Sequence, residues 1–114
     1  MAAPFVWFDL RTNDEARTLA FYRELLQWDI EGGAGQPTMV KGVEGPWAAV
    51  VPNTDGDSQW VPYVQVEDVD AAAARAAQLG GKVVSDKTAG PAGDFAVIAD
   101  PAGAMLALWR PAAA

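Results

Sequence analysis

The chain has 114 residues, of which 51% are hydrophobic and 20% charged, a composition that predicts one soluble globular domain. Its net charge of −7 repels phosphate backbones and anionic membranes, so we expect no nucleic acid and no membrane among its partners. The absence of a long apolar run and of a secretory signal pattern makes the cytoplasm the expected location.

Residues 5–10, FVWFDL, predict the first strand. Alternation along this strand places Val6, Phe8 and Leu10 on one face and Trp7 on the other. A short strand needs only one buried face, so Trp7 is either a second packing surface or a contact for a ligand.

A helix is predicted next, over residues 13–26. Thr12 stands three residues before Glu15, which is the spacing of a capping box at a helix N-terminus. The apolar residues of this segment fall on one broad stripe, so we expect the helix to cover a sheet.

Turn-rich residues 31–37 end this helix, and short apolar runs follow at 38–40 and 47–51. The glycine and proline residues between the two runs predict a hairpin. A polar segment over residues 53–59 is the predicted loop between two halves of the chain.

A similar order of elements follows the loop. Residues 60–67 alternate as a strand does, and an alanine-rich helix over 68–79 ends at Gly80 and Gly81, which suit a left-handed C-cap. A loop over 87–94 and a turn over 100–103 separate the remaining apolar runs. These runs predict strands at 82–85, 95–99 and 105–109.

One offset relates the two halves. Asp14 and Asp68 lie 54 residues apart, as do Leu25 and Leu79. The repeat predicts two βαβββ modules within a single domain, 1–114, of the α+β class. The modules cover residues 4–52 and 60–112. Because a half of roughly 50 residues does not easily bury a core alone, we expect the two modules to pair.

Three short motifs stand at defined places in this repeat: FY in the first helix, DVDA at the start of the second, and DPAG before the last strand. With them, nearly the whole chain resembles the vicinal oxygen chelate superfamily, which includes glyoxalases, bleomycin-resistance proteins and extradiol dioxygenases. The resemblance implies a curved, cup-shaped mixed sheet with the helices on its outside, and a homodimer.

The resemblance also implies three metal-ligand positions. Metal-using members place a histidine seven residues before the Asp that opens each helix, where this chain has Trp7 and Val61. Their glutamate, four residues after the glycine of the D-P-x-G turn, corresponds to Ala107. None of these side chains donates a lone pair to a cation, and the chain contains no His and no Cys. We therefore expect no metal, no cofactor, and no metal-dependent glyoxalase or dioxygenase activity.

The superfamily carries its function on residues that face into the cup. By alternation and position, the candidate ligand-binding residues are Phe5, Trp7, Asp9, Trp47, Val61, Tyr63, Gln65, Met105, Ala107 and Trp109. An aromatic lining with a few polar groups is the usual composition of a small-molecule site. Stacking on tryptophan favours flat ligands that are apolar or cationic.

Packing is the alternative role for several of these side chains. Trp28 and Trp60 are assigned to packing, whereas Trp7, Trp47 and Trp109 suit either packing or a ligand contact. Glu67 directly precedes the second helix, so it is either a solvated strand end or a catalytic carboxylate.

Three functions remain open on the sequence alone. The first is a binding protein of the sequestration or resistance type, which holds a small aromatic or cationic molecule without metal chemistry. The second is a metal-independent isomerase, cyclase or lyase that uses Asp9 or Glu67 as a general base. The third is a non-catalytic interaction protein whose cup is filled by its own side chains.

Overall fold

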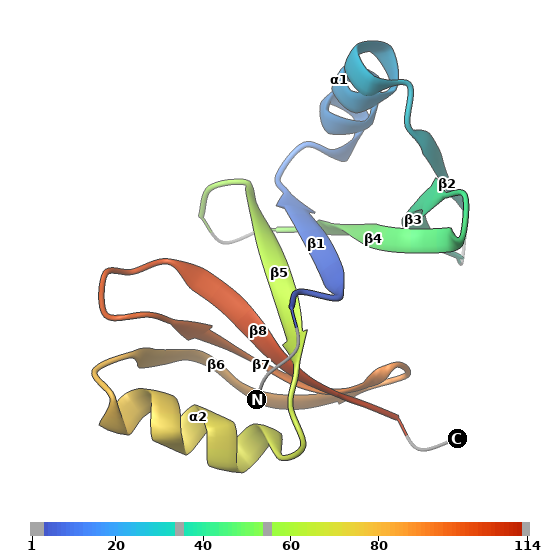
Figure 1. Ribbon diagram of the computed structural model, residues 1–114. Coiled ribbons are helices and arrows are strands. Elements are labelled where there is room, and N and C mark those ends of the chain that lie inside the picture. The colour runs from blue at the N-terminus through green and yellow to red at the C-terminus, as the bar shows by residue number, and fades with distance from the viewer. Residues whose placement is uncertain (1–3, 34–35, 54–55, 113–114) are drawn as a thin grey trace. The chain divides into compact units, whose positions relative to one another are not determined.

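The computed structural model describes residues 4–33, 36–53 and 56–112. Within these residues, two helices and eight strands follow the order β-α-β-β-β twice, which confirms the predicted α+β class (Figure 1). The elements are β1 (Trp7–Thr12), α1 (Glu15–Leu26), β2 (Asp29–Gly33), β3 (Gln36–Gly42), β4 (Gly45–Pro52), β5 (Gln59–Gln65), α2 (Val69–Gln78), β6 (Lys82–Gly90), β7 (Gly93–Ala99) and β8 (Met105–Pro111). In these same ranges, neither helix is long and apolar enough to cross a membrane.

The chain divides into two compact units. The N-terminal unit is Trp7–Val61, and the C-terminal unit is Pro62 onward together with the residues that precede Trp7. The start of the chain joins the C-terminal unit because the backbone N–H of Val6 donates to the carbonyl of Tyr63 at 2.9 Å.

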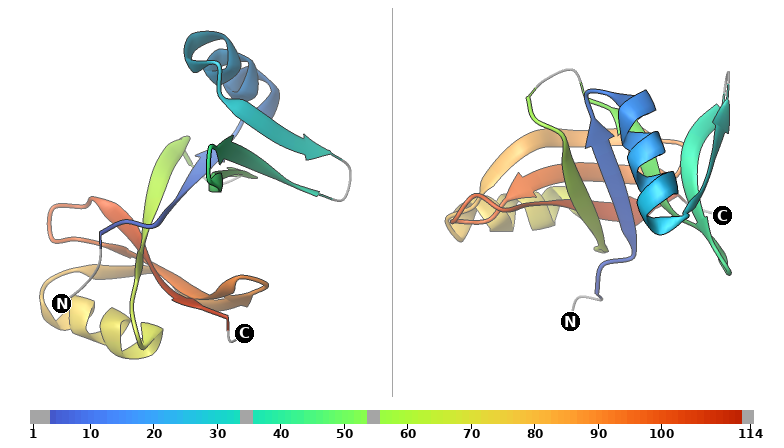
Figure 2. Two further views of the ribbon diagram at one scale, coloured as in Figure 1. Left: turned by 45° about the vertical axis from the view of Figure 1, so that its right-hand side comes forward. Right: turned by 90° about the horizontal axis from the view of Figure 1, so that it is seen from above.

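The N-terminal unit contains a mixed sheet in the order β2-β3-β4-β1. β1 runs parallel to β4, and the other neighbours are antiparallel. α1 lies along one face of this sheet (Figure 2). Five buried apolar residues on that face form the core: Leu10, Ile30, Val40, Ala48 and Val50.

Four aromatic side chains extend this core toward α1, and we call them the aromatic box: Tyr22, Trp28, Trp47 and Trp60. Tyr22 stacks on Trp28 with ring centroids 5.0 Å apart, and Trp47 stacks on Trp60 at 6.4 Å. The indole N–H of Trp60 donates to the hydroxyl of Tyr22 at 3.2 Å. The predicted packing roles of Trp28 and Trp60 are thereby confirmed.

Trp47 reaches the box through a β-bulge. Val40 of β3 pairs with Ala48, but the next residue, Lys41, pairs with Pro46, so Trp47 is the extra residue on β4. Simple alternation would place its side chain on the same face as Ala49, away from α1. Because a bulge re-aims the side chain of the extra residue, the indole instead packs against Trp28 with centroids 4.9 Å apart.

The C-terminal unit has the sheet order β5-β8-β7-β6, with β5 parallel to β8 and the other pairs antiparallel. α2 lies along one face of this sheet and contacts β6, β7 and β8 (Figure 1). Val69, Ala96 and Leu108 are buried there. An ion pair of 2.7 Å between Lys87 and Asp70 links β6 to the helix.

The predicted start of the first helix is wrong by two residues. Asp14 is the N-cap, and its carboxylate accepts a hydrogen bond from the backbone N–H of Arg17 at 3.1 Å. Thr12 acts one step earlier, because its hydroxyl accepts from the backbone N–H of Asp14 at 3.1 Å. Asp and Thr are both good N-cap residues. Because Thr12 is the last residue of β1, Asp14 takes the N-cap position.

The strands β2, β3, β6 and β7 extend into segments predicted as turns or loops. β2 forms where residues 31–37 predict only a turn, because pairing with β3 supplies partners for its backbone. Residues 34 and 35 of that prediction lie outside the described residues. Likewise β6 continues to Gly90, within the predicted loop 87–94, by pairing with β7.

Candidate functional site

The three positions that hold metal ligands in the superfamily that the chain resembles carry side chains that cannot coordinate a metal ion. Trp7 lies on β1 and Val61 on β5 of the N-terminal unit, while Ala107 lies on β8 of the C-terminal unit. Val61 and Ala107 are fully buried. In the described part of the chain, no three His, Cys, Asp or Glu side chains gather as a metal site. These three side chains therefore do not fit a divalent cation.

In the N-terminal unit, Trp7 and Asp9 lie on the face of β1 opposite to the core residue Leu10. The indole N–H of Trp7 donates to a carboxylate oxygen of Asp9 at 3.1 Å, and both side chains are half-buried. The bond therefore fixes the orientation of the indole relative to the carboxylate.

In the C-terminal unit, aromatic side chains surround Ala107 on the sheet face opposite to Leu108, which is buried on the α2 side. Tyr63 of β5 pairs directly with Ala107, and Phe95 of β7 pairs with Trp109, two residues further along β8. The rings of Tyr63 and Phe95 approach to a centroid distance of 6.1 Å. We call Tyr63, Phe95 and Trp109 the aromatic platform.

The members of the aromatic platform differ in exposure. Tyr63 is buried, with 7% of its surface exposed, whereas Phe95 and Trp109 are half-buried. The indole N–H of Trp109 donates to the backbone carbonyl of Ala92 at 3.1 Å, which fixes one edge of the ring. Tyr63 thus supports the platform, and Phe95 and Trp109 provide its accessible surface.

The remaining predicted site residues lie around these surfaces. Gln65 is exposed and pairs with Trp109, and Met105 is half-buried opposite Ala99. Phe5 precedes β1 and is 48% exposed. Glu67 is exposed directly before Asp68, which is the N-cap of α2.

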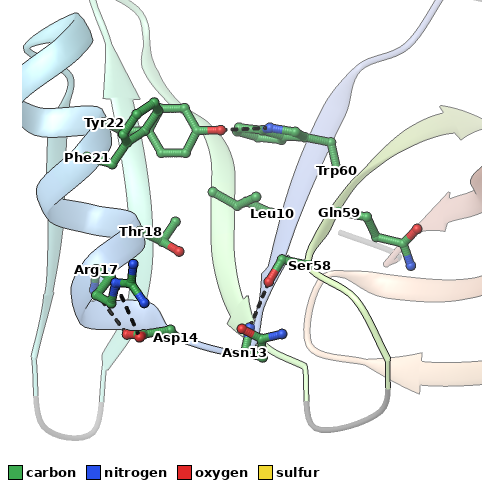
Figure 3. Close-up of a pocket in the computed structure, with 10 residues that line it drawn as sticks. All are labelled: Leu10, Asn13, Asp14, Arg17, Thr18, Phe21, Tyr22, Ser58, Gln59 and Trp60. Atoms are coloured by element: carbon green, nitrogen blue, oxygen red, sulfur yellow. Dashed lines mark hydrogen bonds and ion pairs between the residues drawn. The ribbon is translucent and has the colours of Figure 1, made fainter.

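A pocket of about 440 Å³ lies within the N-terminal unit, between α1 and the start of β5 (Figure 3). Sequence reasoning did not predict it. The lining residues are Leu10, Asn13, Asp14, Arg17, Thr18, Phe21, Tyr22, Ser58, Gln59 and Trp60. Tyr22 and Trp60 of the aromatic box therefore form part of the pocket wall.

Two lysine side chains have raised pKa values, and neither lies in these sites. A hydrogen bond from Lys41 to Glu31, reinforced by the negative charge of Glu31, raises the pKa of Lys41. Asp70 raises the pKa of Lys87 in the same two ways. Both pairs are exposed surface contacts.

A sequence model of the glyoxalase-like domain matches residues 6–109. The chain belongs to the glyoxalase-like family. This glyoxalase-like domain is 35% identical to "Putative glyoxylase CFP32" of Mycobacterium tuberculosis over 94% of the chain and 44% of that protein. It is 32% identical to "Anthracycline biosynthesis protein DnrV" of Streptomyces peucetius over 91% of the chain and 46% of that protein. The glyoxalase-like domain thus spans less than half the length of these curated relatives.

A solved structure shares the fold of this glyoxalase-like domain. Homoprotocatechuate 2,3-dioxygenase from B. fuscum superposes with a TM-score of 0.68 at 16% sequence identity, over 98% of this chain and 33% of that protein. At this identity the likeness shows the fold alone. Together with the family match, it confirms the vicinal oxygen chelate fold that the sequence motifs predict.

Phe95 is the member of the aromatic platform that sequence reasoning missed. A usable signal was present, because the tight turn before β8 makes β7 and β8 a hairpin. Residues of a regular hairpin pair symmetrically about the turn. Counting outward from Ala99 and Met105 therefore brings Phe95 opposite Trp109.

Proposed function

We propose that this glyoxalase-like domain binds a small, planar aromatic molecule on the aromatic platform, without a metal. The observation that carries the proposal is the direct pairing of Phe95 with Trp109, two half-buried rings beside the methyl group of Ala107. Small side chains beside aromatic ones leave a flat apolar surface, and such surfaces with few polar groups are typical of small-molecule sites.

The net charge of the chain and the names of two relatives narrow the chemical class of the proposed ligand. The net charge of −7 favours a cation over an anion, and a cation over a Trp ring gains about 0.5 to 2 kcal/mol. Two relatives carry the name anthracycline biosynthesis protein. Anthracyclines are planar fused-ring compounds, and those with an amino sugar are cationic. We therefore propose a ligand with this combination of a fused aromatic ring system and a positive charge.

Daunorubicin, a fluorescent anthracycline with a protonated amine, is the probe for this proposal. Titration of the wild-type protein is expected to give a saturable change in daunorubicin fluorescence. Trp109→Ala is expected to weaken the affinity about fivefold or more, because loss of one stacking contact of about 1 kcal/mol has this effect. Leu79→Ala is the control, since Leu79 is an exposed apolar residue of the same unit outside the platform.

Phe95→Leu distinguishes the loss of a ligand contact from the loss of the fold. Leucine keeps an apolar side chain at this position and removes only the aromatic ring. We expect it to weaken daunorubicin binding while circular dichroism shows an intact fold. Absence of saturable binding to the wild-type protein, or equal weakening in Leu79→Ala, would contradict the proposal.

The hydrogen bond between Trp7 and Asp9 favours a second function, a metal-independent isomerase, cyclase or lyase. A general base needs a carboxylate that is held in a fixed orientation, and the indole N–H of Trp7 orients the carboxylate of Asp9. The elementary step would be removal of a proton next to a carbonyl group. Among the candidate carboxylates, Glu67 is exposed and is the matched control.

Proton exchange tests this second function without knowledge of the natural substrate. Ethyl benzoylacetate, an aromatic β-ketoester, would be incubated with the protein in D2O containing EDTA, and the loss of its α-proton signal followed by NMR. Acceleration over buffer should persist in Glu67→Gln and disappear in Asp9→Asn. Equal rates in the wild type and Asp9→Asn would exclude Asp9 as the base for this step.

We also propose that two copies of the chain form a homodimer. The support is the match to the glyoxalase-like domain over residues 6–109, since members of the superfamily that the chain resembles commonly complete or stabilise their cup by dimerisation.

A further inference from the structure

The pocket between α1 and β5 is a candidate binding site that the proposed function does not use. Figure 3 shows Tyr22 and Phe21 on the helix side, Trp60 facing them, and Leu10 between the two sides. Asp14, Asn13 and Ser58 lie at the other end. The pocket therefore has an apolar end and a polar end.

The apolar end is rigid and aromatic. Leu10 is 5% exposed, and the hydrogen bond from the Trp60 indole to the Tyr22 hydroxyl fixes two of the rings. Phe21 is different, because 57% of its surface is exposed although its ring meets that of Tyr22 at a centroid distance of 5.1 Å. An occupant of the pocket would cover part of this exposed ring, which is a favourable burial of apolar surface.

The polar end offers hydrogen bonds and little net charge. Among the residues that the structure describes, the side-chain amide of Asn13 has no hydrogen-bond partner, so it can donate to and accept from an occupant. The charges of Asp14 and Arg17 offset each other, since Arg17 Nε lies 3.9 Å from an Asp14 carboxylate oxygen. This end therefore favours a neutral polar group over an ion.

We infer that this pocket is a second small-molecule site, which takes a neutral aromatic compound of one or two rings with a hydroxyl or amide group. The volume of about 440 Å³ lies in the range of small-molecule sites and suits a molecule of this size. The ring would lie against Trp60 and Phe21, and its polar group would reach Asn13. The occupant thus differs in charge and size from the ligand of the aromatic platform.

2-Naphthol is the probe for this pocket, because it has two fused rings and one hydroxyl group. In ¹⁵N-labelled protein, each tryptophan indole N–H gives its own NMR signal, and the variants Trp60→Phe and Trp109→Phe identify two of them. Titration with 2-naphthol is expected to shift the signal of Trp60 in a saturable manner and to leave that of Trp109 in place.

Two variants of the same helix sharpen the test. Phe21→Ala removes an exposed wall of the pocket and should weaken 2-naphthol binding about threefold or more, since a buried ring contact contributes about 0.5 to 1.5 kcal/mol. Leu25→Ala lies one turn further along α1, is similarly exposed, and should bind 2-naphthol as the wild type does. Equal affinities of the two variants, or a Trp60 signal that does not move, would overturn the inference.

Ligand binding in this pocket can be distinguished from ligand binding on the aromatic platform. Trp109→Ala should abolish or weaken daunorubicin binding and leave 2-naphthol binding unchanged, whereas Phe21→Ala should have the reverse effect. A 2-naphthol titration that shifts only the Trp109 signal would assign both probes to the platform and would also overturn the inference.

Discussion

At the scale of the residue, Gly93 shows how closely the strands of the C-terminal unit approach. Its φ of +131° lies in the range that side chains rarely adopt, and it opens β7 opposite Pro111. A Cβ atom at this position would collide with the backbone of Arg110, Pro111 and Ala112. Gly103 also has a positive φ, of +100°, but a Cβ atom there would meet nothing within 4 Å.

These two glycines give a matched prediction for stability. Gly93→Ala combines backbone strain with a backbone collision and should lower the free energy of unfolding by about 3 kcal/mol or more. Gly103→Ala introduces backbone strain without a collision and should lower the free energy of unfolding by only about 1 to 2 kcal/mol. Urea denaturation of both variants checks the difference, and similar values would show that the close approach at Gly93 relaxes without cost.

Sequence reasoning at this scale succeeds where alternation is regular. It places Trp7 and Asp9 on one face, and their hydrogen bond confirms this. It does not place Trp47, because the bulge depends on how β4 pairs with β3 and not on the pattern within β4. Phe95 was within reach of the sequence, since its partner follows from the hairpin turn.

At the scale of the element, α1 is held by few contacts. None of its residues is fully buried, and Leu19 and Tyr22 are the helix residues that pack on the core cluster of the N-terminal unit. Phe21, Leu25 and Leu26 are exposed instead. Tyr22 of the aromatic box is therefore one of the two helix side chains that attach α1 to the core cluster.

Substitution on the two faces of α1 tests this attachment. Tyr22→Ala removes a ring that stacks on Trp28 and a hydroxyl that accepts from Trp60, and should cost about 2 to 4 kcal/mol of unfolding free energy. Leu25→Ala should change stability by less than about 0.5 kcal/mol, because Leu25 is 62% exposed. Hydrogen exchange of the α1 amides should be faster in Tyr22→Ala only; equal exchange in both variants would contradict the attachment.

The helices were easier to predict than the strands. The capping-box spacing of Thr12 and Glu15 located the first helix, and an alanine-rich run before Gly80 and Gly81 located the second. Both predictions lie within two residues of the observed bounds. β2 was missed because its sequence, DIEGG, has little strand preference of its own and is ordered by pairing with β3. The pocket was not predicted, because it depends on side chains from β1, α1 and β5 meeting in space.

At the scale of the whole molecule, the proposed homodimer predicts a particle of twice the chain's mass of 12.0 kDa. The support is the match to the glyoxalase-like domain, whose superfamily commonly forms dimers. Light scattering coupled to gel filtration measures the mass directly. A mass of 12.0 kDa at protein concentrations of about 100 μM, well above the Kd of a stable complex, would contradict the dimer.

We propose above all that this glyoxalase-like domain binds a planar ligand on the aromatic platform without a metal. Calorimetric titration of daunorubicin into protein dialysed against EDTA tests this proposal most directly. We expect one saturable daunorubicin site per chain, with the same affinity before and after dialysis. Binding that disappears on dialysis and returns with stoichiometric Mn²⁺ would contradict it.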